Sequence, residues 1–257
     1  MQQPAQQSVQ QPVRPPTLGL VTIGQAPRTD LTDDARPLLA GFGVVEHGAL
    51  DLDRFDGPEG ERTRAALAPA EGEAPLISRL RDGSSVVLGH DALAPRMRDA
   101  VARCERDGAD ATLLLCTGHF PAVPSRGPLL HAEPLVQQGV RALADRAAVG
   151  VVCPLPAQRE DVGRRWAELL PGPVSVAAAD PYAPGAPEAV ASAARELAAE
   201  GARWLVLDCI GYTERMRAAA AAAVAPGAVV LLARTLAVRL AAEAATAVAA
   251  ARGGRPE

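Results

Sequence analysis

Lysine and asparagine are absent from this 257-residue chain, whose 26 basic residues are all arginine. Without lysine the chain cannot form the internal Schiff base of pyridoxal phosphate enzymes, and it cannot supply the lysine of a phosphate-binding P-loop. Both classes of enzyme are therefore excluded. Aromatic residues are also scarce, at 3% of a sequence that is 48% hydrophobic, so the core must be built mainly from alanine, valine and leucine.

Other absences narrow the function further. No apolar run approaches the roughly 20 residues that a membrane span requires, and a net charge of -4 offers no basic surface for nucleic acid. The four cysteines lack the spacing of a zinc site, and the four histidines are scattered along the chain. We therefore expect no metal site, no nucleic-acid partner and no membrane contact.

The chain begins with a segment rich in glutamine and proline, where a secretory signal would have an apolar stretch. We therefore expect the protein to stay in the cytoplasm, where reducing conditions keep its cysteines as free thiols. The composition of the two ends also predicts disordered tails at residues 1–16 and 252–257.

Short apolar runs alternate along the chain with segments rich in alanine, glutamate and arginine. Runs this short and continuous are typical of strands buried on both faces, as in parallel sheets, so the predicted class is α/β. The expected strands begin at Leu18, Ala111, Ala148, Val174, Trp204 and Ala228, and the expected helices include Pro187–Glu200 and Arg234–Ala251. One segment differs, because Asp82-Gly83 within residues 76–89 is a common signal for a β-hairpin.

Two pairs of segments repeat each other within the chain. "GADATLLLCTGHFP" begins at Gly108 and "GARWLVLDCIGYTE" begins at Gly201, and a shift of 93 positions places Cys116 on Cys209. "LGLVTIGQAPR" and "VGVVCPLPAQR" form a second pair. Each half of the chain thus starts with a glycine-containing strand and later reaches a strand that ends in cysteine.

These repeats predict two similar Rossmann-like lobes with parallel sheets. The first spans residues 17–145 and is joined by the C-terminal helix, about 234–251, while the second spans residues 146–233. Open α/β sheets bind ligands at the carboxyl ends of their strands. Two such lobes that face each other would bring both sets of strand ends to one cleft.

The repeated cysteines, Cys116 and Cys209, suggest acid–base chemistry in that cleft. A helix that begins after a strand stabilises a thiolate at its N-terminus, so we expect the pKa of Cys209 to lie below that of a free thiol. Two thiols on opposite sides of a substrate carbon can remove a proton from one face and return it to the other. The alternative is that cysteine acts as a small buried apolar residue, and we assign Cys104 and Cys153 to that role.

Several segments give the chain a resemblance to the AroM family over Leu18 to Glu243. They are "LGLVTIGQAPRTD", "GEAPLISRLRDG", "LLLCTGHFP", "VGVVCPLPAQ", "DPYA", "LDCIGYTERMR" and "LLARTLAVRLAAE". AroM proteins are similar, more distantly, to the aspartate/glutamate racemase superfamily, which includes hydantoin racemases, maleate isomerases and arylmalonate decarboxylases. The resemblance implies two lobes related by a pseudo-twofold axis, a cleft between them and no cofactor.

By this resemblance Cys116 matches the first cysteine of the superfamily and Cys209 the second. The superfamily commonly continues with Asn-Thr after the first cysteine and with Thr after the second, whereas this chain has Thr117-Gly118 and Ile210-Gly211. Those neighbours normally hold substrate carboxylates, so the substrate class stays open. Some members keep only the second cysteine, which makes Cys209 the firmer candidate.

The remaining candidates come from the family motifs and the repeat. Arg28 is expected to clamp a carboxylate, and the amides near Gly118 and Gly211 to steady an enolate-like oxygen. Asp208 is expected to pair with an arginine. His119 and Tyr212 are candidates for relay or substrate-orienting groups, with packing as the alternative. The full set of substrate-binding candidates is Arg28, Thr117, Gly118, His119, Gln158, Tyr182, Gly211, Tyr212 and Thr213.

The leading hypothesis is a cofactor-independent racemase or isomerase of a small carboxylate, with Cys209 and Cys116 as acid and base. One alternative is a binding or regulatory protein that kept the cleft without turnover, and another is a decarboxylase that uses Cys209 alone. A homodimer is one expected assembly. The AroM family brings no established reaction with it, and a fold does not supply one.

Overall fold

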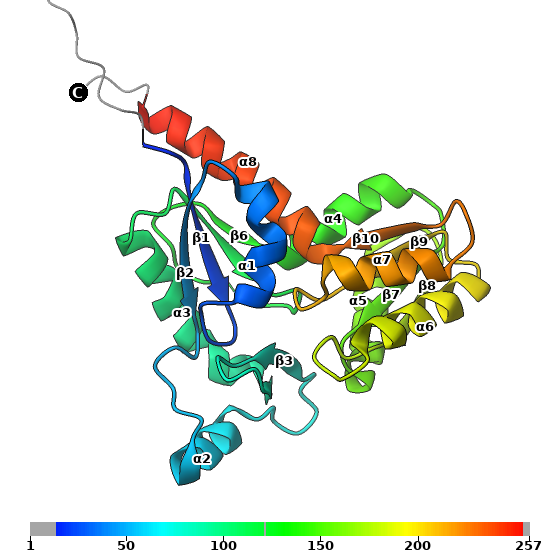
Figure 1. The fold of residues 1–257 in the computed structure, drawn as a ribbon, viewed down its shortest axis with the longest axis horizontal. Helices are drawn as coiled ribbons and strands as arrows, with labels where there is room; N and C mark the ends of the chain where they lie inside the picture. Colours follow the sequence, from blue (N-terminus) through cyan, green and yellow to red (C-terminus); the bar gives the residue numbers. More distant parts are fainter. Residues whose placement is uncertain (1–13, 121, 254–257) are drawn as a thin grey trace, which may run out of the picture.

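Two four-stranded parallel sheets form two lobes that lie side by side in the computed structural model, which describes residues 14–120 and 122–253 (Figure 1). The first sheet has the order β2-β1-β5-β6 and consists of β1 (Thr17–Thr22), β2 (Gly43–Gly48), β5 (Ala111–Leu115) and β6 (Leu129–His131). The second has the order β8-β7-β9-β10 and consists of β7 (Val149–Cys153), β8 (Val174–Ala178), β9 (Trp204–Leu207) and β10 (Val229–Leu232). The two orders correspond strand by strand, which confirms the predicted pair of similar lobes and their pseudo-twofold relation. The exact lobe boundary stays a prediction.

Helices cover both sheets. The first lobe carries α1 (Thr29–Ala35), the 3-10 turn η1 (Arg36–Leu39), α2 (Gly57–Leu67), α3 (His90–Arg106) and α4 (Ala132–Ala144). The second carries the turn η2 (Pro156–Gln158), α5 (Arg159–Leu169), α6 (Ala186–Ala199) and α7 (Glu214–Ala223). The last helix, α8 (Ala233–Gly253), follows β10 and packs back against β1, β5 and α4 (Figure 1). No helix in the described part of the chain is long and apolar enough to cross a membrane.

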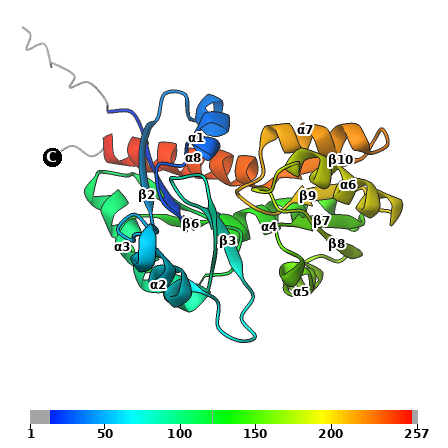
Figure 2. The same ribbon diagram turned by 60° about the horizontal axis from the view of Figure 1, so that its bottom comes forward.

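The predicted hairpin is present and lies outside both main sheets. Strands β3 (Leu76–Arg79) and β4 (Ser85–Leu88) pair antiparallel, and Gly83 in the turn between them has a φ of +84°. Figure 2 turns the hairpin and α2 toward the viewer, on the near side of the first lobe. Both elements are inserted between β2 and α3, and the second lobe has no counterpart between β8 and α6. The hairpin is therefore the main departure from the pseudo-symmetry.

Glycines at equivalent places in β1 and β7 explain the second repeat in the sequence. A Cβ atom on Gly19 would lie 3.0 Å from the Cβ of Cys104, and one on Gly150 would lie 2.8 Å from the Cβ of Leu197. These glycines let α3 and α6 pack closely on their strands. Cys104 is fully buried in this packing, as predicted for it.

The sequence did not predict the edge strands β2 and β6. Most of β2 is only half-buried, and β6 has three residues, none of them fully buried. An edge strand that contacts solvent does not need a continuous apolar run, so the pattern used for the central strands does not find it.

The described part of the chain includes the inner ends of both predicted tails, and the tails themselves stay a prediction. Arg14 donates to Asp110 at 2.8 Å, Arg252 donates to the same carboxylate at 2.7 Å, and Asp110 is 1% exposed. A buried carboxylate requires such partners, so Arg14 and Arg252 both contribute to burying Asp110. The rest of both predicted tails, residues 1–13 and 254–257, lies outside the described residues.

Candidate active site

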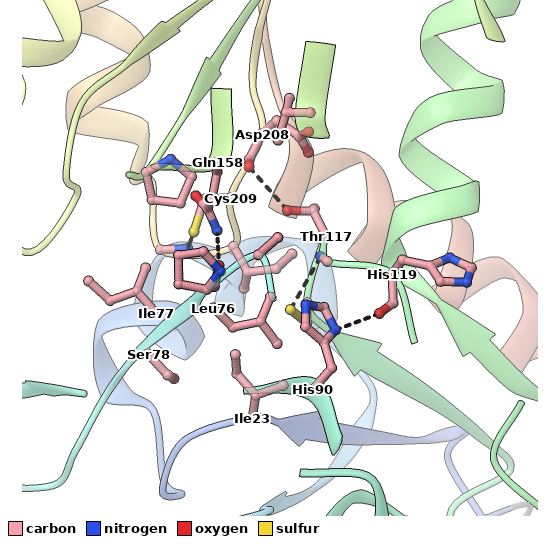
Figure 3. Close-up of a pocket in the computed structure, with 18 of the residues that line it drawn as sticks. Ile23, Leu76, Ile77, Ser78, His90, Thr117, His119, Gln158, Asp208 and Cys209 are labelled. Atoms are coloured by element: carbon pink, nitrogen blue, oxygen red, sulfur yellow. Dashed lines mark hydrogen bonds between the residues drawn. The ribbon is translucent and has the colours of Figure 1, made fainter. Parts of the chain in front are cut away.

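One pocket lies between the lobes at the carboxyl ends of β1, β5, β7 and β9 (Figure 3). Most of the predicted site residues line it, namely Arg28, Cys116, Thr117, Gly118, His119, Gln158, Tyr182, Cys209 and Gly211. Residues from the β3–β4 hairpin complete its wall. Segments far apart in the sequence thus meet where the repeat predicted a cleft.

The two cysteines occupy equivalent positions in this pocket. Cys116 directly follows β5, and the N–H of Gly118 donates to its sulfur at 3.3 Å. Cys209 follows β9 after one intervening residue, and the N–H of Gly211 donates to its sulfur at 3.4 Å. Both thiols therefore receive the same main-chain contact and line the same pocket, one from each lobe.

The expected lowering of the thiol pKa is wrong. Burial raises the pKa of both Cys116 and Cys209 to about 12, and the two glycine N–H groups offset only part of that effect. No helix begins at either sulfur, because α7 starts at Glu214 and the next helix after Cys116 starts at Ala132. Both groups are therefore neutral thiols near pH 7 in this state of the site.

Arg28 is buried, but its guanidinium is already engaged. Its Nε and one terminal nitrogen donate to the two carboxylate oxygens of Asp30, each at 2.8 Å. The other terminal nitrogen donates to Ser78 at 3.2 Å, and the hydroxyl of Tyr182 accepts from Arg28 at 3.3 Å. Although burial opposes the charge, Asp30 and Tyr182 hold the pKa of Arg28 above its ordinary value. A direct, two-pronged contact from Arg28 to a ligand carboxylate would have to displace Asp30, and this role of Arg28 stays a prediction.

Two bulky side chains cover the glycines that follow the cysteines. A Cβ atom on Gly211 would collide with the hydroxyl of Tyr182, and one on Gly118 would lie 2.5 Å from Cδ2 of Leu76. Glycine therefore lets a side chain from elsewhere in the fold approach each loop, and an added Cβ would force Tyr182 or Leu76 to shift. The sequence suggested Tyr182 as a ligand donor but gave no sign of Leu76, which reaches the site only through the inserted hairpin.

Gln158 links the two lobes at the pocket wall. Its side-chain nitrogen donates to the carbonyl of Pro75 at 2.7 Å, and its side-chain oxygen accepts the N–H of Leu155 at 3.1 Å. Both functional groups of this amide are in use, so it fastens the start of the hairpin to the second lobe (Figure 3). The structure therefore gives Gln158 a structural contact between the lobes, and its suggested role as a ligand donor stays a prediction.

Asp208 is a buried carboxyl that lines the pocket. Its Oδ2 accepts the indole N–H of Trp166 at 2.7 Å, and no ion pair with an arginine is found for it in the described part of the chain, contrary to expectation. Burial raises the pKa of Asp208 to about 6, against the indole hydrogen bond and the attraction of Arg165. The Thr117 hydroxyl donates to the main-chain carbonyl of Asp208 at 3.1 Å, which joins the two cysteine loops (Figure 3).

His119 lines the pocket rim but faces outward, toward α4. Its ring is 74% exposed and lies 3.1 Å from Glu133, which also pairs with Arg165 of the second lobe. These residues form the boundary with a wider open basin of about 800 Å³, compared with about 60 Å³ for the pocket. The pocket has room for a small head group, and a larger substituent has room only in the basin.

Tyr212 and Thr213 do not line the pocket, although the sequence grouped them with it. Tyr212 is fully buried in the core of the second lobe, where its hydroxyl donates to the carbonyl of Ala179 at 2.6 Å. Thr213 caps α7, and its hydroxyl accepts the N–H of Met216 at 3.2 Å. Both have structural roles instead. No group of histidine, cysteine and acidic side chains suited to a metal ion is found within residues 14–120 and 122–253.

Comparisons with known proteins agree with this architecture. The AroM protein family model matches residues 18–245. An arylmalonate decarboxylase structure is 17% identical with a TM-score of 0.56, covering 90% of this chain and 92% of that one. An aspartate racemase from Picrophilus torridus is 10% identical with a TM-score of 0.51, covering 90% and 94%. A glutamate racemase isoform from Bacillus anthracis is 10% identical with a TM-score of 0.53, covering 86% and 78%. These likenesses show the fold, and no curated protein matches the sequence significantly.

Proposed function

Because the chain belongs to the AroM family, whose name specifies no reaction, we propose from its site that it is a cofactor-independent racemase or isomerase of a small carboxylate. Cys209 and Cys116 are the acid and base of this proposal. The observation that carries it is the equivalent placement of the two thiols, each after a central strand of its own lobe and both in one pocket.

The proposed reaction is a proton transfer at the carbon next to the carboxylate. One cysteine, as thiolate, takes the proton from that carbon, and the other, as thiol, donates a proton to the opposite face. The electron pair left by the first proton spreads onto the carboxylate oxygens as an enolate and returns to the carbon in the second step. Tyr182, held by Arg28, is a suitable donor to those oxygens.

The raised pKa values of the two thiols limit how much of the protein carries the thiolate that this chemistry needs. With both pKa values near 12, the form with one thiolate and one thiol is a small fraction at neutral pH and grows about tenfold for each pH unit. The proposed activity therefore increases with pH up to the point where the protein unfolds. A ligand or hairpin movement that brings a donor to either sulfur would raise the active fraction.

Deuterium exchange at the α-carbon of a bound carboxylate tests the proposal. Ligands come first from a thermal-shift screen of small carboxylates, because any ligand of the native state stabilises it. We expect exchange in D₂O that Cys209→Ala and Cys116→Ala each reduce by at least about a hundredfold. Cys104→Ala is the matched control, since it removes a buried thiol outside the pocket and keeps the Cβ that packs on Gly19.

Two other outcomes would support the alternatives. Loss of carbon dioxide that needs Cys209 but not Cys116 would indicate a decarboxylase. Ligand protection without exchange would indicate a binding protein, a reading favoured by the engaged guanidinium of Arg28 and the neutral thiols. We also keep the predicted cytoplasmic location and homodimer as proposals, the latter testable by light scattering.

A further inference from the structure

Arg28, which the sequence suggests as a carboxylate clamp, has no hydrogen-bond donor left for a ligand. A guanidinium carries five N–H groups, and that of Arg28 makes five hydrogen bonds. Two of them go to Asp30, and the other three go to the hydroxyls of Thr22, Ser78 and Tyr182. A carboxylate in the pocket could therefore be held by Arg28 only at the expense of an existing contact.

Arg165 is the other arginine that lines the pocket, and it keeps unused donors. It lies on α5 of the second lobe and also lines the basin. Its Nε donates to Asp161 at 2.9 Å and its Nη1 donates to Glu133, whereas no hydrogen bond from its Nη2 is found in the described part of the chain. Among the described residues, the one buried side-chain nitrogen or oxygen without a partner is Nε of Arg103. The unbonded Nη2 is therefore not buried and faces open space.

The acids around Arg165 orient its guanidinium and leave part of it available. The side chain is 16% exposed, and contacts to Asp161 of its own helix and to Glu133 of α4 hold it where the two lobes meet. Burial opposes the charge, but Glu133, Asp161 and Asp208 hold the pKa of this guanidinium above its ordinary value, so it stays charged. The attraction of Asp208 also indicates that the guanidinium lies near the residue directly before Cys209.

We infer that Arg165 binds the carboxylate of the ligand, through an Nη2 that faces the junction of the pocket and the basin. This inference rests on the proposed function for the presence of a carboxylate on the ligand, and it requires no particular reaction. A hydrogen bond between an ionised donor and an ionised acceptor is among the strong ones in proteins. A guanidinium that other contacts already hold loses little freedom when it makes one more. Arg165 thus supplies a cation for the ligand without the loss of an existing contact.

Glu133 competes with a ligand carboxylate for this arginine. Its Oε1 accepts from Nη1 of Arg165, and its Oε2 lies 3.1 Å from Nδ1 of His119. Glu133→Gln keeps the shape of the side chain and removes its charge, so the guanidinium loses one of the negative charges that offset it. Binding of a carboxylate should then improve. A purely structural role of the pair predicts no such gain, because loss of the ion pair would only loosen the site.

The test compares how matched acids and amides protect Cys116 and Cys209 against iodoacetamide. Propionate, butyrate and 3-phenylpropionate are the acids, and propionamide, butyramide and 3-phenylpropionamide have the same shapes without the charge. Protection is the ratio of labelling rates without and with the probe, so a change in the reactivity of the free thiols cancels. Arg165→Gln should weaken protection by the acids by about tenfold or more and leave protection by the amides unchanged.

Arg164→Gln is the matched control for the loss. Arg164 is the preceding residue on α5 and also pairs with Asp161, but it is 60% exposed and lines only the basin. Its substitution should leave the preference for acids over amides intact.

Glu133→Gln keeps the test decisive if Arg165→Gln folds poorly, because it should strengthen protection by the acids by about threefold or more. Glu168→Gln is the control for this gain. It removes the charge of a basin acid that is 67% exposed and pairs with Arg164, and it should leave protection unchanged.

The outcomes separate this inference from the proposed function, because each acid is also assayed for α-carbon exchange in D₂O. Protection by acids that depends on Arg165, without exchange, keeps the inference and contradicts the proposed catalysis. Exchange that Arg165→Gln leaves unchanged keeps the catalysis and overturns the inference. Equal protection by acids and amides, or none by any acid, also overturns the inference. Circular dichroism of each variant excludes misfolding as the cause of a loss.

Discussion

The loop 115–119 of the first lobe and the loop 208–212 of the second are alike at the sulfur and different on either side of it. Each sulfur accepts an N–H from the glycine two residues later. The residue before the cysteine is Leu115 in one loop and the buried acid Asp208 in the other. Three residues after the cysteine, His119 is exposed whereas Tyr212 is fully buried.

This difference indicates that the two cysteine loops are held with different firmness. The second loop is fixed, because Tyr212 anchors it in the core and Asp208 is bonded to Trp166. The first loop borders the open basin, and its glycine is covered by Leu76 of a hairpin that only this lobe contains. The two thiols therefore have equivalent positions but different surroundings, and we expect the loop of the first lobe to adjust more readily to a ligand of the proposed function.

Asp208→Asn should give the largest effect on stability. The folded pKa of about 6 lies above the ordinary 3.8, so the native state binds more protons than the unfolded state between these values. Stability contributed by the protonated acid is thus present below pH 4 and lost as the pH rises through 6. Asparagine does not titrate, so we expect the variant to gain about 3 kcal/mol over the parent protein between pH 4 and pH 7.

Urea unfolding of the parent protein and of Asp208→Asn across this pH range measures the gain in unfolding free energy. Effects of pH on other groups are the same in both proteins and cancel when the two free energies are subtracted. A constant difference from pH 4 to pH 7 would show that Asp208 is not held in its neutral form.

Alkylation of the two site cysteines should rise steeply with pH. Because both folded pKa values are near 12, the thiolate fraction and the labelling rate should increase about a hundredfold from pH 7 to pH 9. A free thiol with a pKa of about 8.5 gains only about 25-fold over that interval. Cys116 is half-buried whereas Cys209 is 9% exposed, so Cys116 should now label first.

Peptide mass spectrometry gives the rate at each cysteine, with glutathione as the free-thiol control. Faster labelling of Cys209 than of Cys116 would contradict the exposures in the structure. If the labelling rate at either cysteine stopped rising below pH 9, the pKa of that thiol would lie well below 12, and the prediction would be wrong.

The glycines after the cysteines should differ in their tolerance of alanine. Gly211→Ala meets the hydroxyl of Tyr182, which Arg28 holds in place, and should cost about 2 kcal/mol. Gly118→Ala meets the end of Leu76, a side chain on the inserted hairpin, and should cost about half as much. Adding Tyr182→Phe should recover part of the first loss but none of the second, as measured in a double-mutant cycle of unfolding free energies.

The sequence predicted the strands and cysteines that repeat in both halves of the chain. It did not predict the side chains that reach the site from segments outside the repeat. Continuous apolar runs identified the central strands, and the shift of 93 residues paired Cys116 with Cys209. The environment of each thiol could not be predicted in this way, because Leu76 arrives through the hairpin and Trp166 through α5. Burial of both thiols, which sets their pKa, likewise results from packing between the lobes and not from the local motif.

The last comparison concerns the residues three positions after each cysteine, and it should give the smallest effect. Tyr212→Phe removes the only hydroxyl that bonds the carbonyl of Ala179 in the described structure and leaves that buried acceptor unsatisfied, which should cost about 1–2 kcal/mol of unfolding free energy. His119→Gln removes an exposed contact to Glu133 and should change stability by less than about 0.5 kcal/mol. Urea unfolding at pH 7 measures both. The hydrogen bonds to the two sulfurs come from the N–H groups of Gly118 and Gly211, which neither substitution removes, so alkylation of Cys209 should be unchanged in both variants. A loss in His119→Gln as large as that in Tyr212→Phe would mean that the first loop is anchored as firmly as the second, and the proposed division between a fixed and an adaptable lobe would fail.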